Sequence, residues 1–323
     1  MAKGFIFDVE LGFGGAASAR DIFGAELIKA AKINRDIFYI TCDYHVKGSQ
    51  VDKFSEEFPE QYFDIGIAEA NGVGIAAGLA LGGKMPFVQG FGPFLSLRDV
   101  DQIHTDVAYN DLPVRLIGTH GGLTSGGGPT HYTICDYAIM RAIPNMTMIV
   151  PADANQCSKI VQASLNYDGP IYIRMARGEE PLAYMDQDYS YEIGKANIAV
   201  EGRDFTIIGC GIGVAMGIAA SEILKNDGIK VRVIDMHTLK PMDSDAVITA
   251  ARETGGIVTV EDHNIIGGLG DGVAAILAEE GLGIKFKRLG IPDIFPSLGG
   301  AEELYAHYGY DVHGIVDCVK ALL

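Results

Sequence analysis

Short segments rich in β-branched and aromatic residues alternate with helix-length segments along almost the whole chain of 323 residues. In the first half, the predicted strands are IFYITC (37–42), YFDIGI (62–67), MPFVQG (85–90), PVRLIGT (113–119), MTMIVP (146–151) and IYIRM (171–175). Strands that are separated by helices form parallel sheets with helices on both faces. The pattern therefore predicts an α/β fold built on a doubly wound parallel sheet.

The alternation stops after Arg177 and then resumes. Residues 178–202, GEEPLAYMDQDYSYEIGKANIAVEG, show no clear period and are interpreted as a linker. A second α/β unit follows, with strands predicted at FTIIGCG (205–211), KVRVIDM (230–236), GIVTVED (256–262) and FKRLGI (286–291). We expect two doubly wound domains, residues 1–190 and a smaller one of residues 191–323.

Composition narrows the classes of function. Hydrophobic residues make up 48% of the chain, which is enough for two cores, and no apolar run reaches the roughly 18 residues of a membrane span. The N-terminus lacks the apolar core of a signal peptide, so we expect a cytoplasmic protein without membrane contact. The five cysteines show no metal-ligand spacing and are expected to be reduced packing residues. The net charge of −17 argues against non-specific nucleic-acid binding.

Glu69 is the single acidic side chain between Ile65 and Gly83. One interpretation is a first-turn acid that the helix dipole favours by about 0.3–1 kcal/mol. However, Glu69 follows a predicted strand, and open α/β sheets bind ligands at the carboxyl ends of their strands. The helix after it carries small residues four apart, which predicts close approach of another helix, from this chain or from another. A carboxylate shielded in this way can share a proton with a ligand nitrogen.

A glycine-rich loop, THGGLTSGGGPTH, follows another predicted strand and is bracketed by His120 and His131. Glycine is costly to order, so such a loop is expected where its backbone faces a ligand. Two histidines at the mouth of a parallel sheet favour a site, because histidine transfers protons near neutral pH. Phe91 and Phe94 follow the strand MPFVQG, and they are either core residues or the face on which a flat heteroaromatic ring stacks.

Two further glycine motifs are interpreted as structural. In TIIGCGIGVAMG the third glycine of a dinucleotide fingerprint is replaced by Val214, so we expect a tight turn there. The segment Gly270-Asp271-Gly272 has no asparagine at the spacing of a metal-diphosphate motif, and we expect it to begin a helix. No metal-ligating residue is therefore assigned in this chain.

The order of Glu69, the Phe91/Phe94 pair, the loop ending in GPTH, AIPNMTMIVPADANQ and RMARGEEPL resembles the transketolase family of thiamine-diphosphate enzymes. The chain is similar to the pyrimidine-binding and C-terminal domains, as in the beta subunits of split transketolases. It also resembles the corresponding part of 1-deoxy-xylulose-5-phosphate synthase.

The resemblance implies roles for these residues. The matching glutamate hydrogen-bonds N1′ of the cofactor's aminopyrimidine and favours the imino tautomer, whose N4′ removes the thiazolium C2 proton. Phe91 and Phe94 match positions that pack against that ring, with Phe94 as the expected stacking residue. His131 matches a histidine that contacts substrate oxygens near the reacting carbon.

The resemblance also implies a sugar-phosphate site and a partner. Arg20, His120 and Arg177 match the positions that bind the phosphate, and a guanidinium suits that geometry. For Arg20, in the first turn of a helix, a surface salt bridge remains an equal alternative. An alpha subunit would hold Mg²⁺ and the diphosphate, and the assembly implied is a heterotetramer with two copies of each chain.

One departure from the family pattern concerns the substrate. Transketolases carry an acidic pair in the glycine loop, where this chain has Gly126, Gly127 and Gly128. The loss of a carboxylate is expected to leave room and to remove a negative charge. It favours a ketose or aldehyde that differs from the ordinary pentose phosphates.

The leading hypothesis is a transketolase beta subunit that, with its alpha partner, moves a two-carbon ketol unit from a ketose to an aldehyde. One alternative is a beta subunit of a 2-oxo acid dehydrogenase first component or a synthase that uses pyruvate. An alternative of another class is a non-catalytic, regulatory α/β dimer.

Overall fold

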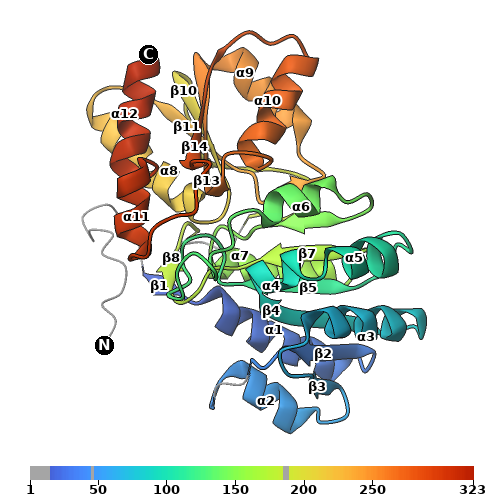
Figure 1. Cartoon of the computed structure of the whole chain (residues 1–323). Coiled ribbons are helices and arrows are strands. Elements are labelled where there is room, and N and C mark those ends of the chain that lie inside the picture. The colour runs from blue at the N-terminus through green and yellow to red at the C-terminus, as the bar shows by residue number, and fades with distance from the viewer. Residues whose placement is uncertain (1–14, 45–46, 185–188) are drawn as a thin grey trace.

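The computed structural model describes residues 15–44, 47–184 and 189–323, which form two large sheets with helices packed around them and a third sheet of two short strands (Figure 1). The N-terminal unit has strands β1 (Ala16–Ala17), β2 (Ile37–Thr41), β3 (Tyr62–Asp64), β4 (Met85–Phe91), β5 (Arg115–Thr119), β6 (Thr147–Ile149), β7 (Ile171–Arg174) and β8 (Glu180–Pro181). Its helices are α1 (Ala19–Ile33), α2 (Gln50–Glu57), α3 (Glu69–Leu81), α4 (Gly92–Leu97), α5 (Val100–Gln102), the π-helical η2 (Ile103–Ala108), α6 (Asp136–Ala142) and α7 (Ala154–Ser164).

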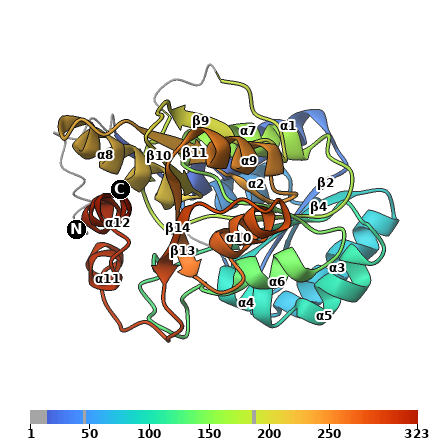
Figure 2. The same cartoon turned by 90° about the horizontal axis from the view of Figure 1, so that it is seen from above.

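The C-terminal unit is built in the same way. Its strands are β9 (Asn197–Val200), β10 (Phe205–Gly209), β11 (Val231–Asp235), β12 (Thr238–Lys240), β13 (Gly256–Asn264) and β14 (Lys285–Ile291). Its helices are α8 (Ile212–Asn226), α9 (Ser244–Glu253), α10 (Leu269–Glu279), α11 (Ala301–Tyr308) and α12 (Val312–Leu322). Helices α8 and α12 cover one face of its sheet, and α9 and α10 cover the other (Figure 2).

The two large sheets have the strand orders β12-β6-β7-β5-β4-β2-β3 and β14-β13-β10-β11-β9, and β1 pairs with β8 in the small third sheet. All pairings are parallel in the first sheet from β6 to β3, and in the second from β14 to β11. One edge strand of each sheet runs antiparallel: β12 beside β6, and β9 beside β11. Because β12 belongs to the C-terminal unit, it ties the second unit to the first sheet.

The doubly wound α/β prediction is confirmed, and every strand predicted from the alternation is present. The segment interpreted as a linker, residues 178–202, contains β8 and β9, so that part of the prediction is wrong. The two structural interpretations of glycine motifs hold. Gly211 has a φ of 55° directly before α8, and Gly270 lies in the first turn of α10.

The central strands are buried on both faces, which is why they form continuous apolar runs in the sequence. On one face of the first sheet, α1, α2 and α7 enclose a core of their own. The core on the opposite face continues from Val73 and Met148 into Ile208 and Ile234 of the second unit. The two units therefore share a hydrophobic interior. Among the described residues, no helix is long and apolar enough to cross a membrane.

Asp262, near the end of β13, anchors the glycine loop of the first unit to the second unit. Its carboxylate accepts hydrogen bonds from the Leu123 amide at 3.1 Å and from the hydroxyls of Tyr305 and Tyr310, each at 3.0 Å. Gly122 has a φ of 58°, and a methyl carbon placed on it would lie 1.8 Å from Asp262 Oδ2. Only glycine allows the loop to approach this carboxylate.

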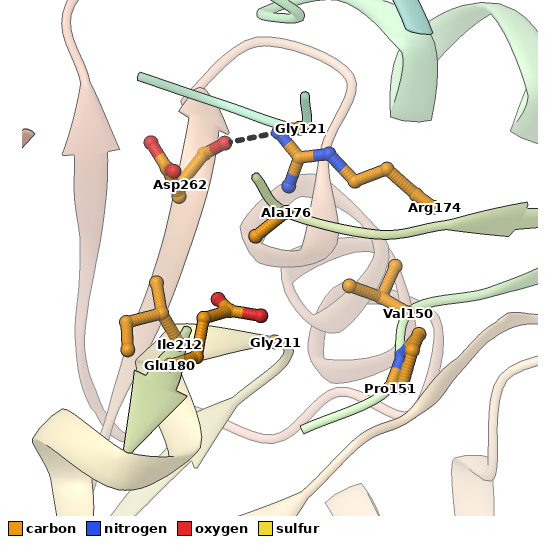
Figure 3. A pocket seen from close by; sticks show the side chains of 9 residues that line it. All are labelled: Gly121, Val150, Pro151, Arg174, Ala176, Glu180, Gly211, Ile212 and Asp262. Atoms are coloured by element: carbon orange, nitrogen blue, oxygen red, sulfur yellow. Dashed lines mark hydrogen bonds between the residues drawn. The ribbon is translucent and has the colours of Figure 1, made fainter. Parts of the chain in front are cut away.

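Arg174 extends from the end of β7 to Asp262, at the contact between the two units that we call the seam. Its Nη2 donates to the carbonyl oxygen of Asp262 at 2.8 Å (Figure 3). The same Nη2 donates to the carbonyl oxygen of Thr133 at 2.9 Å, and Nη1 donates to the Tyr137 hydroxyl. A cavity of about 20 Å³, the size of one water molecule, lies beside it and is lined by Glu180 and Asp262. The seam thus buries acidic groups around one guanidinium.

Burial raises the pKa of the Glu180 carboxyl to about 8, and nearby Asp262 and Asp153 add to the shift while Arg174 opposes it. The folded state therefore holds a proton on Glu180 that the unfolded chain releases near its ordinary pKa. Folding takes up this proton between about pH 4.5 and 8, so the contribution of Glu180 to stability falls as the pH rises through that window.

We expect Glu180→Gln to raise the melting temperature at pH 8.5, because the amide has no proton to lose, and to leave it nearly unchanged at pH 5. Thermal unfolding followed by circular dichroism at both pH values measures the effect. The matched control is Glu179→Gln, since Glu179 is exposed next to Glu180. Equal shifts at both pH values would contradict the assignment.

Candidate active site

The predicted site residues lie on loops at the carboxyl edge of the first sheet. Glu69 follows β3, Phe91 ends β4, His120 follows β5 and Arg177 follows β7. The five neighbouring strands β3, β2, β4, β5 and β7 are parallel, so the segments that follow them leave at one edge. Arg20 reaches this edge from the first turn of α1.

Glu69 is the first residue of α3, and its side chain is only 5% exposed. It accepts a hydrogen bond from Nη1 of Arg98 at 3.1 Å, and the Arg98 side chain is 50% exposed. Glu69 thus lies at the positive end of the α3 dipole and beside a guanidinium. Glu69 is therefore a buried acid that an arginine reaches from the solvent side.

Two aromatic rings stand beside this carboxylate. The centroids of Phe91 and Phe94 lie 5.9 Å apart with an angle of 22° between the planes, and Phe94 meets the His131 ring edge-on at 5.1 Å. These residues and Glu69 line one cavity of about 190 Å³. The cavity thus offers an acidic end and flat apolar walls, with a histidine at its side.

His120 contacts one residue of this cavity, Phe91, and one of a second cavity, Tyr44. Its ring centroid lies 4.1 Å from that of Phe91, and its Nδ1 is 2.9 Å from the Thr119 hydroxyl. Burial, together with the positive charges of Arg20 and Arg177, lowers the pKa of His120 to about 3. His120 is therefore neutral at physiological pH, while both arginines lie close enough to act on it.

Arg20 binds the hydroxyl of Tyr44 through Nη1 and lines a cavity of about 110 Å³ with Tyr39 and Gln89. Its buried Nε has no hydrogen-bond partner among the residues that the structure describes. Burial lowers the pKa of Arg20. A half-buried guanidinium with an unused donor, facing a cavity, differs from the surface salt bridge that was the alternative for this residue.

The room expected at the three glycines is filled by two of the predicted site residues. A methyl carbon on Gly126 would lie 2.6 Å from Nη1 of Arg177, and one on Gly127 would lie 2.7 Å from Cγ of His131. The expectation of extra space was wrong. The absence of side chains here lets the arginine and the histidine pack directly on the loop backbone.

Sequence reasoning missed three residues of the site: Arg98, Asp99 and Cys42. Arg98 lies four residues after Phe94 and follows α4, and this spacing on one helical face was the available signal. Asp99 is fully buried, and neither carboxylate oxygen has a hydrogen-bond partner within the described ranges. Burial and the charge of Glu69 raise the pKa of Asp99 to about 7. No pattern in the sequence distinguished it from a surface acid.

Two family models match this chain. The transketolase pyrimidine-binding domain matches residues 16–181, and the transketolase C-terminal domain matches residues 194–315. The chain belongs to the transketolase family. The carboxylate, the aromatic pair and the glycine loop all lie within the pyrimidine-binding match.

Two relatives that match this chain over nearly their whole length are transketolase subunits. It is 39% identical to one subunit of the apulose-4-phosphate transketolase of Phocaeicola vulgatus, covering 94% of this chain and 96% of that protein. It is 38% identical to a 6-deoxy-6-sulfo-D-fructose transketolase subunit of a Clostridium species, covering 92% of each. A solved split-gene transketolase, an inactive beta4 tetramer, matches with a TM-score of 0.87 and 36% identity, covering 96% of this chain and 99% of that one.

The resemblance to the transketolase family is confirmed, and so is the resemblance to part of 1-deoxy-xylulose-5-phosphate synthase. 1-Deoxy-D-xylulose-5-phosphate synthases are also relatives, and the chain spans about half of their length. The order of a pyrimidine-binding domain followed by a C-terminal domain is confirmed as well. The boundary at residue 190 stays a prediction.

We expect His120 to remain neutral between pH 5 and pH 8, because a lowered pKa means that the folded chain does not take up its proton in that range. Nuclear magnetic resonance titration of the imidazole Cε1–H signals measures this, with His120→Asn assigning the signal. Arg177→Gln should raise the midpoint, since it removes one of the opposing charges. A midpoint between pH 5 and pH 8 in the wild type would show that the ring is not held neutral.

Proposed function

We propose that this chain is the beta subunit of a thiamine-diphosphate-dependent transketolase, which moves a two-carbon ketol unit from a ketose to an aldehyde. The observation that carries the proposal is the buried Glu69 carboxylate at one end of a cavity walled by Phe91 and Phe94. The two alternatives are a beta subunit of a 2-oxo acid dehydrogenase component and a non-catalytic dimer. Neither accounts for the arginines that lie near this cavity and its buried Glu69 carboxylate.

The donor set fits the aminopyrimidine end of the cofactor. A planar ring with nitrogen at its edge needs an apolar face and an acidic partner, and Phe94 and Glu69 offer these within one cavity. When bound, thiamine diphosphate supplies the carbon nucleophile that adds to the substrate carbonyl. Glu69 would hold a proton at N1′, and Phe94 would fix the plane of the ring.

His131 and the charged residues would act on the substrate. His131 lies edge-on to Phe94 and lines the same cavity, so it would hold a proton on the substrate oxygen next to the reacting carbon. Arg20, His120 and Arg177 would bind an anionic tail. The neutral state of His120 suits a hydrogen-bond donor between two guanidinium groups.

A chain with a net negative charge can still bind an anionic substrate where its arginines cluster. The net charge is −17, yet Arg20, Arg98 and Arg177 gather around the two cavities, so the local field differs from the global one. Acids far from the site lower the affinity for polyanions in general. A small anionic substrate experiences mainly the nearby guanidinium groups, because screening in salt limits the reach of the rest to about 8–10 Å.

An alpha subunit would complete the site, with Mg²⁺ and the diphosphate held mainly on its side. The support in this chain is the outer face of α3, where a methyl carbon on Gly74 or Gly78 would meet no described residue within 4 Å. Ile67 and Leu81, at the two ends of that helix, are each 72% exposed. This face fits the close helix approach predicted from the small residues, and we infer an assembly with two copies of each chain.

The location and the domain boundary are part of the same proposal. All five cysteines are free, as expected of a reducing compartment, so we infer a cytoplasmic protein. We place the boundary between the domains near residue 190, between the two segments matched by the family models.

We expect the isolated chain to bind thiamine diphosphate poorly, and addition of the alpha chain with Mg²⁺ to restore binding and ketol transfer. Glu69→Gln should leave assembly intact and slow the exchange of the cofactor C2 proton by about 100-fold or more, a typical loss for a general acid–base group. Deuterium exchange at C2 in the assembled complex is the measurement.

The control for the Glu69 variant is Glu57→Gln, which changes an exposed acid on α2, outside the residues that line the cavity. Full activity of the purified single chain would disprove the dependence on a partner. An unchanged exchange rate in Glu69→Gln would return Glu69 to the role of a helix-start acid.

We infer a donor other than the ordinary pentose phosphates, because the glycine loop has no carboxylate to accept a substrate hydroxyl. Two relatives are named for apulose 4-phosphate and 6-deoxy-6-sulfofructose, which supports an atypical ketose with an anionic group. Arg177 and His131 pack on the loop where the family's acidic residues would stand, so the site is also more cationic there.

The prediction is that xylulose 5-phosphate has a lower kcat/KM than a branched or deoxygenated ketose carrying an anionic tail. Gly127→Asp should move the preference toward ordinary ketose phosphates, since a site that bonds a hydroxyl discriminates against analogues without it. Because any Cβ at this position must push His131, Gly127→Ala is the matched control. We would measure kcat/KM for a panel of donor sugars with wild type, Gly127→Asp and Gly127→Ala. A change seen in Gly127→Asp and absent from Gly127→Ala is due to the carboxylate and not to the displacement of His131. A wild type that prefers xylulose 5-phosphate, with no shift in Gly127→Asp, would show that another group replaces the acid.

A further inference from the structure

We propose that Arg98 is a placeholder for the aminopyrimidine ring: its guanidinium holds Phe94 and Glu69, the two residues assigned to the ring, and the cofactor must displace it to reach them. The inference rests on the proposed cofactor site. Arg98 makes both of the contacts that are assigned above to the ring. Its central carbon lies 4.1 Å from the centroid of Phe94, and its Nη1 donates to Glu69 Oε2 at 3.1 Å.

The local backbone prepares this arrangement. Arg98 directly follows α4, and its amide donates to the carbonyl oxygen of Phe94 at 3.0 Å, so the two side chains are neighbours on one helical face. The contact needs no movement of another element. The side chain is nevertheless half exposed, so it can leave toward solvent without unpacking the core.

The chemistry of the two groups is similar. A guanidinium is planar and presents N–H donors along its edge, as does the protonated aminopyrimidine with its exocyclic amine. Both can stack on an aromatic face and bond one carboxylate. Arg98 therefore compensates the buried charge of Glu69 before the cofactor arrives, when an unpaired buried carboxylate would be costly.

Because the cofactor displaces it, Arg98 competes with the cofactor for Glu69 and Phe94 and does not itself bind the cofactor. The cofactor has to break one partly exposed ion pair and one cation–π contact, each of which is weak at such a site. The affinity lost in this way is about three- to tenfold. A residue that helped to hold the cofactor would have the opposite effect on affinity when it is removed.

The test is the dissociation constant of thiamine diphosphate, measured by titration calorimetry on the assembled complex with Mg²⁺. We expect Arg98→Met, which keeps the stem but loses the guanidinium, to bind the cofactor about three- to tenfold more tightly than wild type. Arg98→Lys keeps the charge without the plane and should lie in between. Combined with Glu69→Gln, the gain from Arg98→Met should shrink, because the contested carboxylate is gone.

The matched control is Arg35→Met. Arg35 also lies over an aromatic ring, Phe58, at 5.8 Å, and its Nη1 donates to Gln61, but neither of these partners lines the cavity that holds Glu69. It should leave the dissociation constant unchanged. Equal or weaker binding by Arg98→Met, with normal binding by wild type, would overturn the placeholder alone. A wild-type complex that does not bind the cofactor would overturn the proposed cofactor site, and this inference with it.

Discussion

Five adjacent parallel strands, β3, β2, β4, β5 and β7, end at one edge of the first sheet, and everything at the candidate site depends on that geometry. Each strand is followed by a segment that turns away there, so residues far apart in the sequence meet without a dedicated scaffold. Glu69, Phe91, His120 and Arg177 come from four of these segments. The central strands are buried and apolar, which leaves the polar chemistry to the loops.

A loop rich in glycine needs external support to keep one shape, and the second unit provides it. The Asp262 carboxylate binds the amide of Leu123, while Arg174 binds carbonyl oxygens on both sides of the seam. These buried bonds fix the segment that carries His120 and His131. The C-terminal unit thus contributes to the site through the backbone of the first unit, and its own side chains do not line the cavity that holds Glu69.

The sequence predicted the architecture well because apolar alternation directly reflects burial of parallel strands. It missed β9 and β12 because they are only four and three residues long and lie at sheet edges, and in β9 half-exposed positions weaken the pattern further. The structure places Glu69, Phe91, Phe94 and His131 at one cavity, and these four were predicted as site residues because strand ends mark ligand positions. Arg98 was not, because its contact with Glu69 joins residues 29 apart and depends on how α4 turns. The contacts of Gly126 and Gly127 likewise arise from packing that a sequence of three glycines does not encode.

Helix α3 links the chemistry of the site to assembly. Its first residue is Glu69, and its outer face carries Gly74 and Gly78, whose added methyl carbons would meet no described part of this chain. A helix moves as a rigid body over 13 residues, so a partner that packs against these glycines also fixes the position of the carboxylate at its N-terminus. Burial by the partner would remove water from the open side of Glu69 and strengthen its interaction with whichever planar cation it holds. Docking of a partner on this face would therefore alter the environment of Glu69, the group for which Arg98 and the proposed cofactor compete.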